Sequence, residues 1–133
     1  MHAAVPYLTF PGTCAEALAF YCDVFGAEVT IHQTMGESPL EVAPEAESLV
    51  FNAELRAGEL VLKASDNPGL DGSAMPMSPI SVFVTCETSA EQRRIFDALA
   101  AGGQTLFALE GGFGMVIDRF HVPWMLAGPP NVP

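Results

Sequence analysis

The sequence predicts an α+β fold in which two βαβββ modules pair into a curved mixed eight-stranded sheet, with the helices outside. Three observations predict this fold. The order strand, helix, glycine and three strands occurs twice along the chain. Two capping-box patterns, Thr13–Glu16 and Thr88–Glu91, begin 75 residues apart. An apolar hairpin closes the chain and needs a sheet and a helix to cover it. Paired modules would enclose a cup.

The first module is expected at about 4–66 of a single domain that spans 1–133. A strand at Val5–Phe10 leads into a helix with one apolar stripe, and Gly26 ends that helix in a left-handed turn. Three more strands are expected at Glu28–Met35, Leu49–Leu55 and Glu59–Ala64.

The segment Gly36–Ser48 is expected to be a loop, since it holds two prolines and four glutamates and no basic residue. Two interpretations remain open for it. It is either a solvated surface loop or a lid over a pocket.

A linker is expected at about 67–79, which is rich in Gly, Pro, Ser and Asp. The second module follows at about 80–127. It is expected to begin with a strand at Ile80–Cys86, and its helix closes at Gly102-Gly103. The remaining elements are a strand at Thr105–Leu109 and the hairpin Gly111–Leu126, which turns at Asp118 and Arg119.

The composition excludes several classes of partner. The 133 residues include 5 Lys and Arg against 16 Asp and Glu, a formal charge of −11, so nucleic acids and anionic membranes are not expected partners. No apolar run has membrane-spanning length and no signal peptide begins the sequence. The three cysteines form no Cys-x-x-Cys pair, which fits a cytoplasmic location. The 50% hydrophobic content indicates a cavity lining or a subunit interface.

Three stretches carry a family resemblance: Pro6–Phe10 with Cys14–Ala17 and Phe20-Tyr21, then Ser65-Asp66, and finally Gly112–Phe120 with Val122–Met125. They resemble the vicinal oxygen chelate superfamily, which includes glyoxalase I, bleomycin-resistance proteins and extradiol dioxygenases, and more narrowly its PhnB-like branch. The resemblance implies the paired modules and a homodimer. The branch often bears a methyltransferase label, but the sequence has no glycine-rich strand-to-helix turn for a nucleotide-like cofactor, so methyl transfer is not expected.

Active members of this superfamily commonly bind a divalent metal through His, Gln and Glu of the first, fourth, fifth and eighth strands. The corresponding positions here are near Val5 or Tyr7, near Ile80 or Ser81, and at Met125. None of them is a histidine, and methionine is a poor ligand for a hard divalent ion. We therefore expect no metal and no cofactor. The three histidines are expected at the terminus, in a sheet and in a turn; a site formed by His2 and His121 with Asp118 is the alternative.

Seven residues are candidates for ligand binding. The apolar candidates are expected either to line the cup or to pack in the core: Tyr7, Phe51, Phe113, Met115 and Met125. Asn52 interrupts an apolar strand, and an inward amide must find a partner. Asp66 follows an apolar strand and either faces the mouth of the cup or caps a turn. Strand alternation places Trp124 and Met125 on opposite faces of the sheet, so if Met125 occupies the ligand position, Trp124 packs under the helices.

The function expected first is small-molecule binding by an apolar cup without the usual metal site. The alternative is a metal-dependent lyase, isomerase or dioxygenase with displaced ligands. The third hypothesis is a fold used only for subunit contacts. The sequence names neither a ligand nor a catalytic residue.

Overall fold

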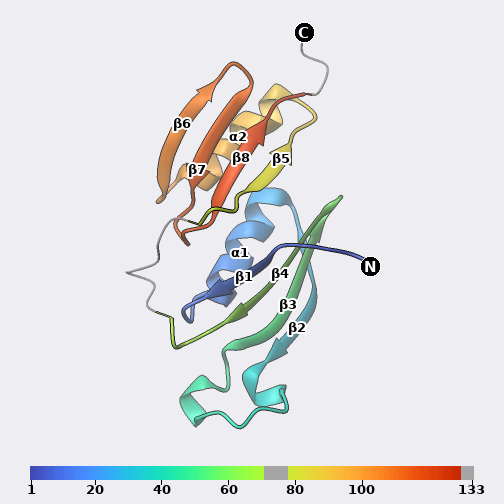
Figure 1. The fold of residues 1–133 in the computed structure, drawn as a ribbon, viewed down its shortest axis with the longest axis vertical. Helices are drawn as coiled ribbons and strands as arrows, with labels where there is room; N and C mark the ends of the chain where they lie inside the picture. Colours follow the sequence, from blue (N-terminus) through green and yellow to red (C-terminus); the bar gives the residue numbers. More distant parts are fainter. Residues whose placement is uncertain (71–77, 130–133) are drawn as a thin grey trace. The chain divides into compact units, whose positions relative to one another are not determined.

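The computed structural model describes residues 1–70 and 78–129 (Figure 1). The chain divides into two compact units, the first module (residues 1–74) and the second module (residues 75–133). Each holds one four-stranded sheet, with strand orders β1-β4-β3-β2 and β5-β8-β7-β6. The α+β class and the repeated βαβββ order are confirmed, with the strands divided between two sheets. The expected linker at 67–79 lies in part, at 71–77, outside the described residues.

The first module consists of β1 (Tyr7–Phe10), α1 (Cys14–Phe25), β2 (Glu28–Thr34), β3 (Val50–Ala57) and β4 (Leu60–Asp66). β1 runs parallel to β4, and the other pairs are antiparallel. The first strand begins two residues later than expected. Helix α1 packs on β2, β3 and β4 and so covers one face of this sheet.

Helix α1 forms as the sequence predicts over most of its length. Its buried residues recur at helical spacing and make one stripe: Cys14, Ala17, Leu18, Tyr21 and Val24. Gly26 ends the helix with φ of 63°, a left-handed conformation that costs glycine little. The predicted capping box is wrong, because the Thr13 side chain makes no capping hydrogen bond. The first N–H of the helix, that of Cys14, donates to Asp66, 52 residues away, over 2.8 Å.

The acidic segment between β2 and β3 is closed by hydrogen bonds at its two ends. Met35 N–H donates to the Leu49 carbonyl, and Gly36 N–H donates to the Glu47 carbonyl. Two short 3₁₀ turns lie within it, η1 (Met35–Glu37) and η2 (Pro44–Ala46). An unexpected capping box between Thr34 and Glu37 begins η1. The lid interpretation stays a prediction.

The second module consists of β5 (Val82–Thr85), α2 (Ser89–Ala100), β6 (Gln104–Glu110), β7 (Phe113–Ile117) and β8 (Pro123–Ala127). Helix α2 packs on β6, β7 and β8. Its predicted capping box forms by half: Thr88 Oγ1 accepts from Glu91 N–H, while the Glu91 carboxylate accepts from Glu87 N–H, one residue earlier than expected. The Arg119 guanidinium donates to the Ala101 carbonyl just after α2 ends.

In each module, one buried polar side chain links elements of the helix and the sheet by hydrogen bonds, and we call it the fastening residue. In the first module, Asp66 of β4 accepts from Cys14 N–H and from Val50 N–H over 2.8 and 2.9 Å. In the second, Gln92 of α2 donates to the carbonyls of Gly112 and Leu126 over 2.9 and 3.2 Å. The fastening residue belongs to the sheet in the first module and to the helix in the second.

One edge strand in each sheet is irregular. β2 pairs with β3 through register shifts between Val29 and Ile31 and between Gln33 and Thr34. β6 pairs with β7 through shifts between Thr105 and Phe107 and between Phe107 and Glu110. No helix within residues 1–70 and 78–129 is long and apolar enough to cross a membrane.

Candidate functional site

The helix-free face of a sheet is defined here as the face that the helix of its own module leaves uncovered. In the second module, one row of cross-strand partners on this face crosses all four strands: Phe83, Met125, Met115 and Phe107. Directly opposed residues share a face, so the four side chains stand side by side. The end members, Phe83 and Phe107, are 59% and 61% exposed, and the two methionines are half-buried. We call this set the apolar row.

Three of the predicted ligand-binding residues lie on this face. Met115 and Met125 are opposed within the apolar row, and Phe113 is opposed to Ala127 in the neighbouring row. Sequence reasoning missed Phe83 and Phe107, which extend the row to both edges of the sheet. For Phe83, the alternation within Val82–Thr85 was the available signal.

The opposite face of this sheet is committed to packing. It carries three fully buried side chains, Trp124, Val116 and Leu126. The prediction that Trp124 and Met125 lie on opposite faces of the sheet is therefore confirmed. Gly114 lies on the same face, opposed to Leu126. The Phe96 ring of α2 packs against it, and a Cβ at this position would come within 2.6 Å of the ring. Contact with α2 therefore excludes a side chain at Gly114, while no helix constrains the residues of the helix-free face.

A buried carboxylate shapes the turn between β7 and β8. Asp118 is 2% exposed and accepts from the backbone N–H groups of Phe120 and Val122. Its second oxygen accepts from the indole N–H of Trp124 over 2.8 Å. Sequence reasoning treated Asp118 as a polar turn residue, whereas the structure makes it the group that positions the tryptophan.

The equivalent row on the first module's helix-free face has a charged centre. Its four opposed residues are Tyr7, Lys63, Glu54 and Ile31. In the next row, Val61, Arg56 and Glu28 are opposed. We call Lys63, Glu54 and Arg56 the charged cluster. The lysine and glutamate take the central places that two methionines occupy in the apolar row.

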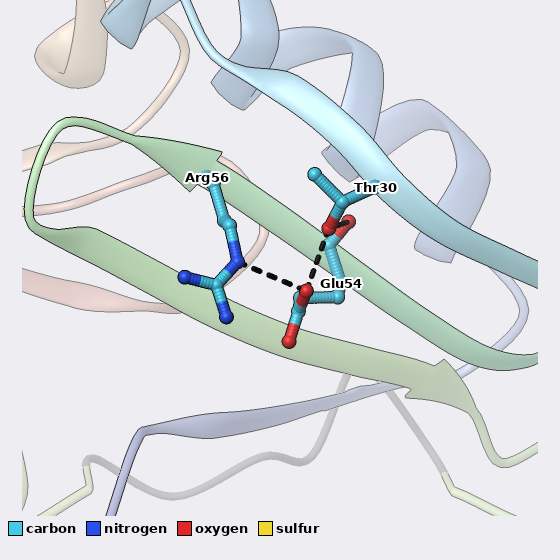
Figure 2. Close-up of polar contacts among 3 residues, drawn as sticks. All are labelled: Thr30, Glu54 and Arg56. Atoms are coloured by element: carbon cyan, nitrogen blue, oxygen red, sulfur yellow. Dashed lines mark hydrogen bonds and ion pairs between the residues drawn. The ribbon is translucent and has the colours of Figure 1, made fainter. Parts of the chain in front are cut away.

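Glu54 is the most constrained side chain of the charged cluster. Figure 2 shows Thr30 Oγ1 and Arg56 Nε both donating to one oxygen, Oε2, over 2.7 and 3.1 Å. The Glu54 side chain is 15% exposed, against 54% for Arg56. These hydrogen bonds, first that of Thr30 and then that of Arg56, and the positive charges of Arg56 and Lys63 hold the pKa of Glu54 below its ordinary value. The carboxylate is thus both fixed and ionised.

The other predicted residues of the first module are spread out. Tyr7 is 51% exposed on the helix-free face, beside Lys63. Asn52 is half-buried and opposed to Gln33. Phe51 is half-buried at the register shift between β2 and β3, where it has no opposed partner.

Asp66, for which the mouth of a cup and a turn cap were both open, is a buried residue of the first module. It is 6% exposed, and its two oxygens accept from the backbone N–H groups of Cys14 and Val50. Burial, with a smaller effect of the nearby Asp66 charge, raises the pKa of the Cys14 thiol to about 12. Asp66 therefore holds the first module together, and its burial leaves a ligand little access to it.

The residues present do not fit the metal site that the resemblance implies. Tyr7 and Met125 stand where histidine and glutamate ligands are common in the superfamily. Within residues 1–70 and 78–129, no three His, Cys, Asp or Glu side chains gather closely enough to hold a metal ion. The histidines lie as expected: His2 is exposed near the terminus, His32 is exposed in β2, and His121 is an exposed turn residue with φ of 71°.

Comparison with known proteins agrees with this fold. The family model described as 3-demethylubiquinone-9 3-methyltransferase matches residues 2–127. Protein YjdN of Escherichia coli (strain K12) is 31% identical over an alignment of length 137. The alignment covers 91% of this chain and 91% of YjdN. The crystal structure of protein PA1353 from Pseudomonas aeruginosa is 32% identical, with a TM-score of 0.83 over 97% of this chain and 98% of that one.

Two further structures extend the relationship. A protein from Bacillus cereus, described as a putative 3-demethylubiquinone-9 3-methyltransferase and PhnB protein, is 25% identical, with a TM-score of 0.79 over 96% of this chain and 99% of that one. A bleomycin resistance determinant encoded on the transposon Tn5 is 15% identical, with a TM-score of 0.57 over 98% of this chain and 99% of that one, and so shares the fold alone. The chain belongs to the family described as 3-demethylubiquinone-9 3-methyltransferase, in agreement with its resemblance to PhnB-like proteins.

Proposed function

We propose that this protein binds a small apolar molecule on the helix-free face of its second module. The apolar row supports the proposal: four large apolar side chains cross the whole sheet, and those at both ends are more than half exposed. Soluble proteins rarely leave a contiguous apolar patch without a use for it. Ligand sites are lined mainly by aromatic and aliphatic side chains, and methionine adapts to irregular ligands.

The methyl transfer named in the family description is not part of the proposal. A cofactor with a nucleotide-like body is typically held by a glycine-rich turn between a strand and a helix. The turn before α1 is Pro11-Gly12-Thr13, with one glycine, and the turn before α2 is Cys86-Glu87-Thr88, with none. We expect S-adenosylmethionine to leave the melting temperature unchanged.

We also propose that the protein binds its ligand without a metal ion. The residues at the positions expected to hold a metal include Tyr7 and Met125, which are poor ligands for a hard divalent ion. The test is elemental analysis of untagged protein purified without chelator, repeated after incubation with manganese, zinc, nickel and iron. We expect no stoichiometric metal. One tightly held ion per chain would contradict this and would favour the metal-dependent enzyme, with His121 and His32 the first residues to replace.

The ligand-binding proposal is tested with Nile red, an uncharged dye that fluoresces in apolar sites. Met115→Gln and Met125→Gln keep the length of the side chain and make its end polar. We expect each variant to weaken dye binding about tenfold, because each removes apolar contact at the centre of the row. The matched control is Leu40→Gln, since Leu40 is 55% exposed but lies in the acidic segment outside the row.

The same samples distinguish a ligand site from a contact between copies. The homodimer implied by the resemblance stays a prediction, measured by sedimentation equilibrium. If the apolar row serves only as a subunit contact, the wild type will be a dimer that does not bind the dye, and Met115→Gln will be a monomer. That result would overturn the ligand-binding proposal.

A further inference from the structure

The distribution of positive charge in the first module is uneven. Arg56 and Lys63 are the only lysine or arginine residues in positions 1–74, which hold eleven of the chain's 16 acidic residues. Both lie on the helix-free face of one sheet, on the two strands β3 and β4. Within the described residues 1–70, this face is therefore the one that presents lysine and arginine side chains to an anion.

The contacts within the charged cluster leave most of its hydrogen-bonding capacity unused. Arg56 donates to Glu54 through Nε, and no residue within 1–70 and 78–129 accepts from its two terminal nitrogens. Lys63 faces Glu54 across the strands, but its ammonium makes no hydrogen bond or ion pair with any residue in the described ranges. One positive charge would be enough to neutralise Glu54, so the second, from Arg56 or Lys63, is left to attract an anion.

The Glu54 carboxylate likewise uses only one of its two oxygens for the hydrogen bonds with Thr30 and Arg56. Its two hydrogen bonds converge on Oε2, and Figure 2 shows the second carboxylate oxygen, Oε1, on the side turned away from Thr30, with no dashed line to it. Among the described residues, none donates to Oε1. An ionised carboxylate with one oxygen fixed and the other open is a strong, oriented acceptor.

We propose that the charged cluster binds a small molecule that carries an anionic oxygen group beside a hydroxyl. The anionic oxygens accept hydrogen bonds from the terminal nitrogens of Arg56 and from the Lys63 ammonium, and the hydroxyl donates to Glu54 Oε1. Arg56 orients Glu54 through Nε while its other donors face the ligand, and Thr30 keeps the carboxylate from rotating. The proposal does not rest on the apolar row, because it uses a different module and different chemistry.

The test is a ¹⁵N NMR titration of the full chain with glycerol 3-phosphate, which has both an anionic group and hydroxyls. We expect saturable shifts of backbone amides around Thr30, Glu54, Arg56 and Lys63, and weakening as salt is added. Glycerol, which lacks the anion, should cause no saturable shift. Absence of saturable shifts in the wild type, or shifts confined to the second module, would overturn the proposal without any variant being needed.

Charge-removing variants then separate the roles. Lys63→Gln and Arg56→Gln should each weaken glycerol 3-phosphate about tenfold. The matched control is Arg93→Gln, which removes an exposed positive charge of α2 in the second module and should leave the affinity unchanged. Equal weakening by all three would indicate only a general effect of net charge and would contradict the proposal.

Glu54→Gln tests the hydroxyl contact by a ratio of affinities. In the wild type, glycerol 3-phosphate should bind more tightly than methyl phosphate, which has the anion and no hydroxyl. In Glu54→Gln, methyl phosphate should bind as well as before or better, since a negative charge is gone, and the ratio should fall towards one. An unchanged ratio would rule out Glu54 as the acceptor. Nile red binding in these variants should stay as in the wild type, so this proposal and the previous one fail separately.

Discussion

The two modules repeat one topology, but their helix-free faces have opposite character. At four equivalent places across the sheet, the first module has Tyr7, Lys63, Glu54 and Ile31, and the second has Phe83, Met125, Met115 and Phe107. The helix-facing sides are alike, with buried apolar residues in both. The helix dictates one side of each strand through packing, and alternation leaves the other side free to carry function.

The first prediction compares the two fastening residues and has the largest expected effect. Asp66→Ala removes a buried carboxylate and leaves two backbone N–H groups without a partner, so the free energy of unfolding should fall by about 3 kcal/mol or more. Gln92→Ala removes an uncharged amide that donates to two carbonyls and should cost about 1–2 kcal/mol. Urea unfolding followed by circular dichroism measures both.

The milder variant Asp66→Asn covers the case in which Asp66→Ala fails to fold. Glu59→Ala, at an exposed turn of the same module, is the control and should change little. A larger loss for Gln92→Ala than for Asp66→Ala would show that the second module depends more on its fastening residue, the reverse of our expectation.

The second prediction compares the two sides of one strand. Gly114→Ala places a Cβ against the Phe96 ring and should cost about 1–3 kcal/mol of unfolding free energy through overpacking. Its neighbour Met115, on the helix-free face, should accept glutamine at a much smaller cost. Thermal unfolding measures the difference. Adding Phe96→Leu to Gly114→Ala should recover part of the loss, and no recovery would mean that another contact excludes the methyl group.

The third prediction exchanges the character of the two faces. Glu54→Met with Lys63→Met gives the first module a central methionine pair and should create Nile red binding there, while Met115→Glu with Met125→Lys should abolish it in the second module. Fluorescence titration measures both double variants. If dye binding stays the same in both, the row residues do not determine what these faces bind.

The fourth prediction concerns pH and has the smallest effect. The pKa of Glu54 is lower in the folded chain than its ordinary value of 4.5, chiefly through hydrogen bonds from Thr30 and Arg56 and also through the Arg56 and Lys63 charges. A lowered folded pKa gives stability that is present above pH 4.5 and is lost as the pH falls through the folded pKa. Glu54→Gln should therefore flatten the acid side of the stability profile. An unchanged profile would mean that Glu54 is not held in this way in solution.

Local patterns were enough to predict the order of elements and part of the candidate site. Alternation within β7 and β8 placed Met115 and Met125 on one face and Trp124 on the other, because a strand fixes this relation internally. The charged cluster could not be found in this way. Glu54 and Lys63 lie nine residues apart in the sequence, and only the pairing register of β3 and β4 makes them opposed.

The start of α1 shows a second limit. The sequence Thr13 to Glu16 has the residues of a capping box, yet the Cys14 N–H donates to Asp66 at the end of β4. The first N–H of the helix is thus capped by a buried carboxylate that only the fold brings there. The same contact explains why Asp66 was placed among the ligand-binding candidates: its partners are 16 and 52 residues away, beyond any local pattern.

The broken register of β2 and β6 has a consequence for how readily another chain can pair with these edge strands. A regular edge strand offers a row of N–H and carbonyl groups on which another chain can add a strand, the first step of aggregation. Both of these edge strands carry two register shifts, which interrupt that row. A chain that is 50% hydrophobic thus has protection built into its backbone as well as into its negative charge. Substitutions that straighten β2 or β6 should promote fibre or precipitate formation even where they leave the folded chain more stable.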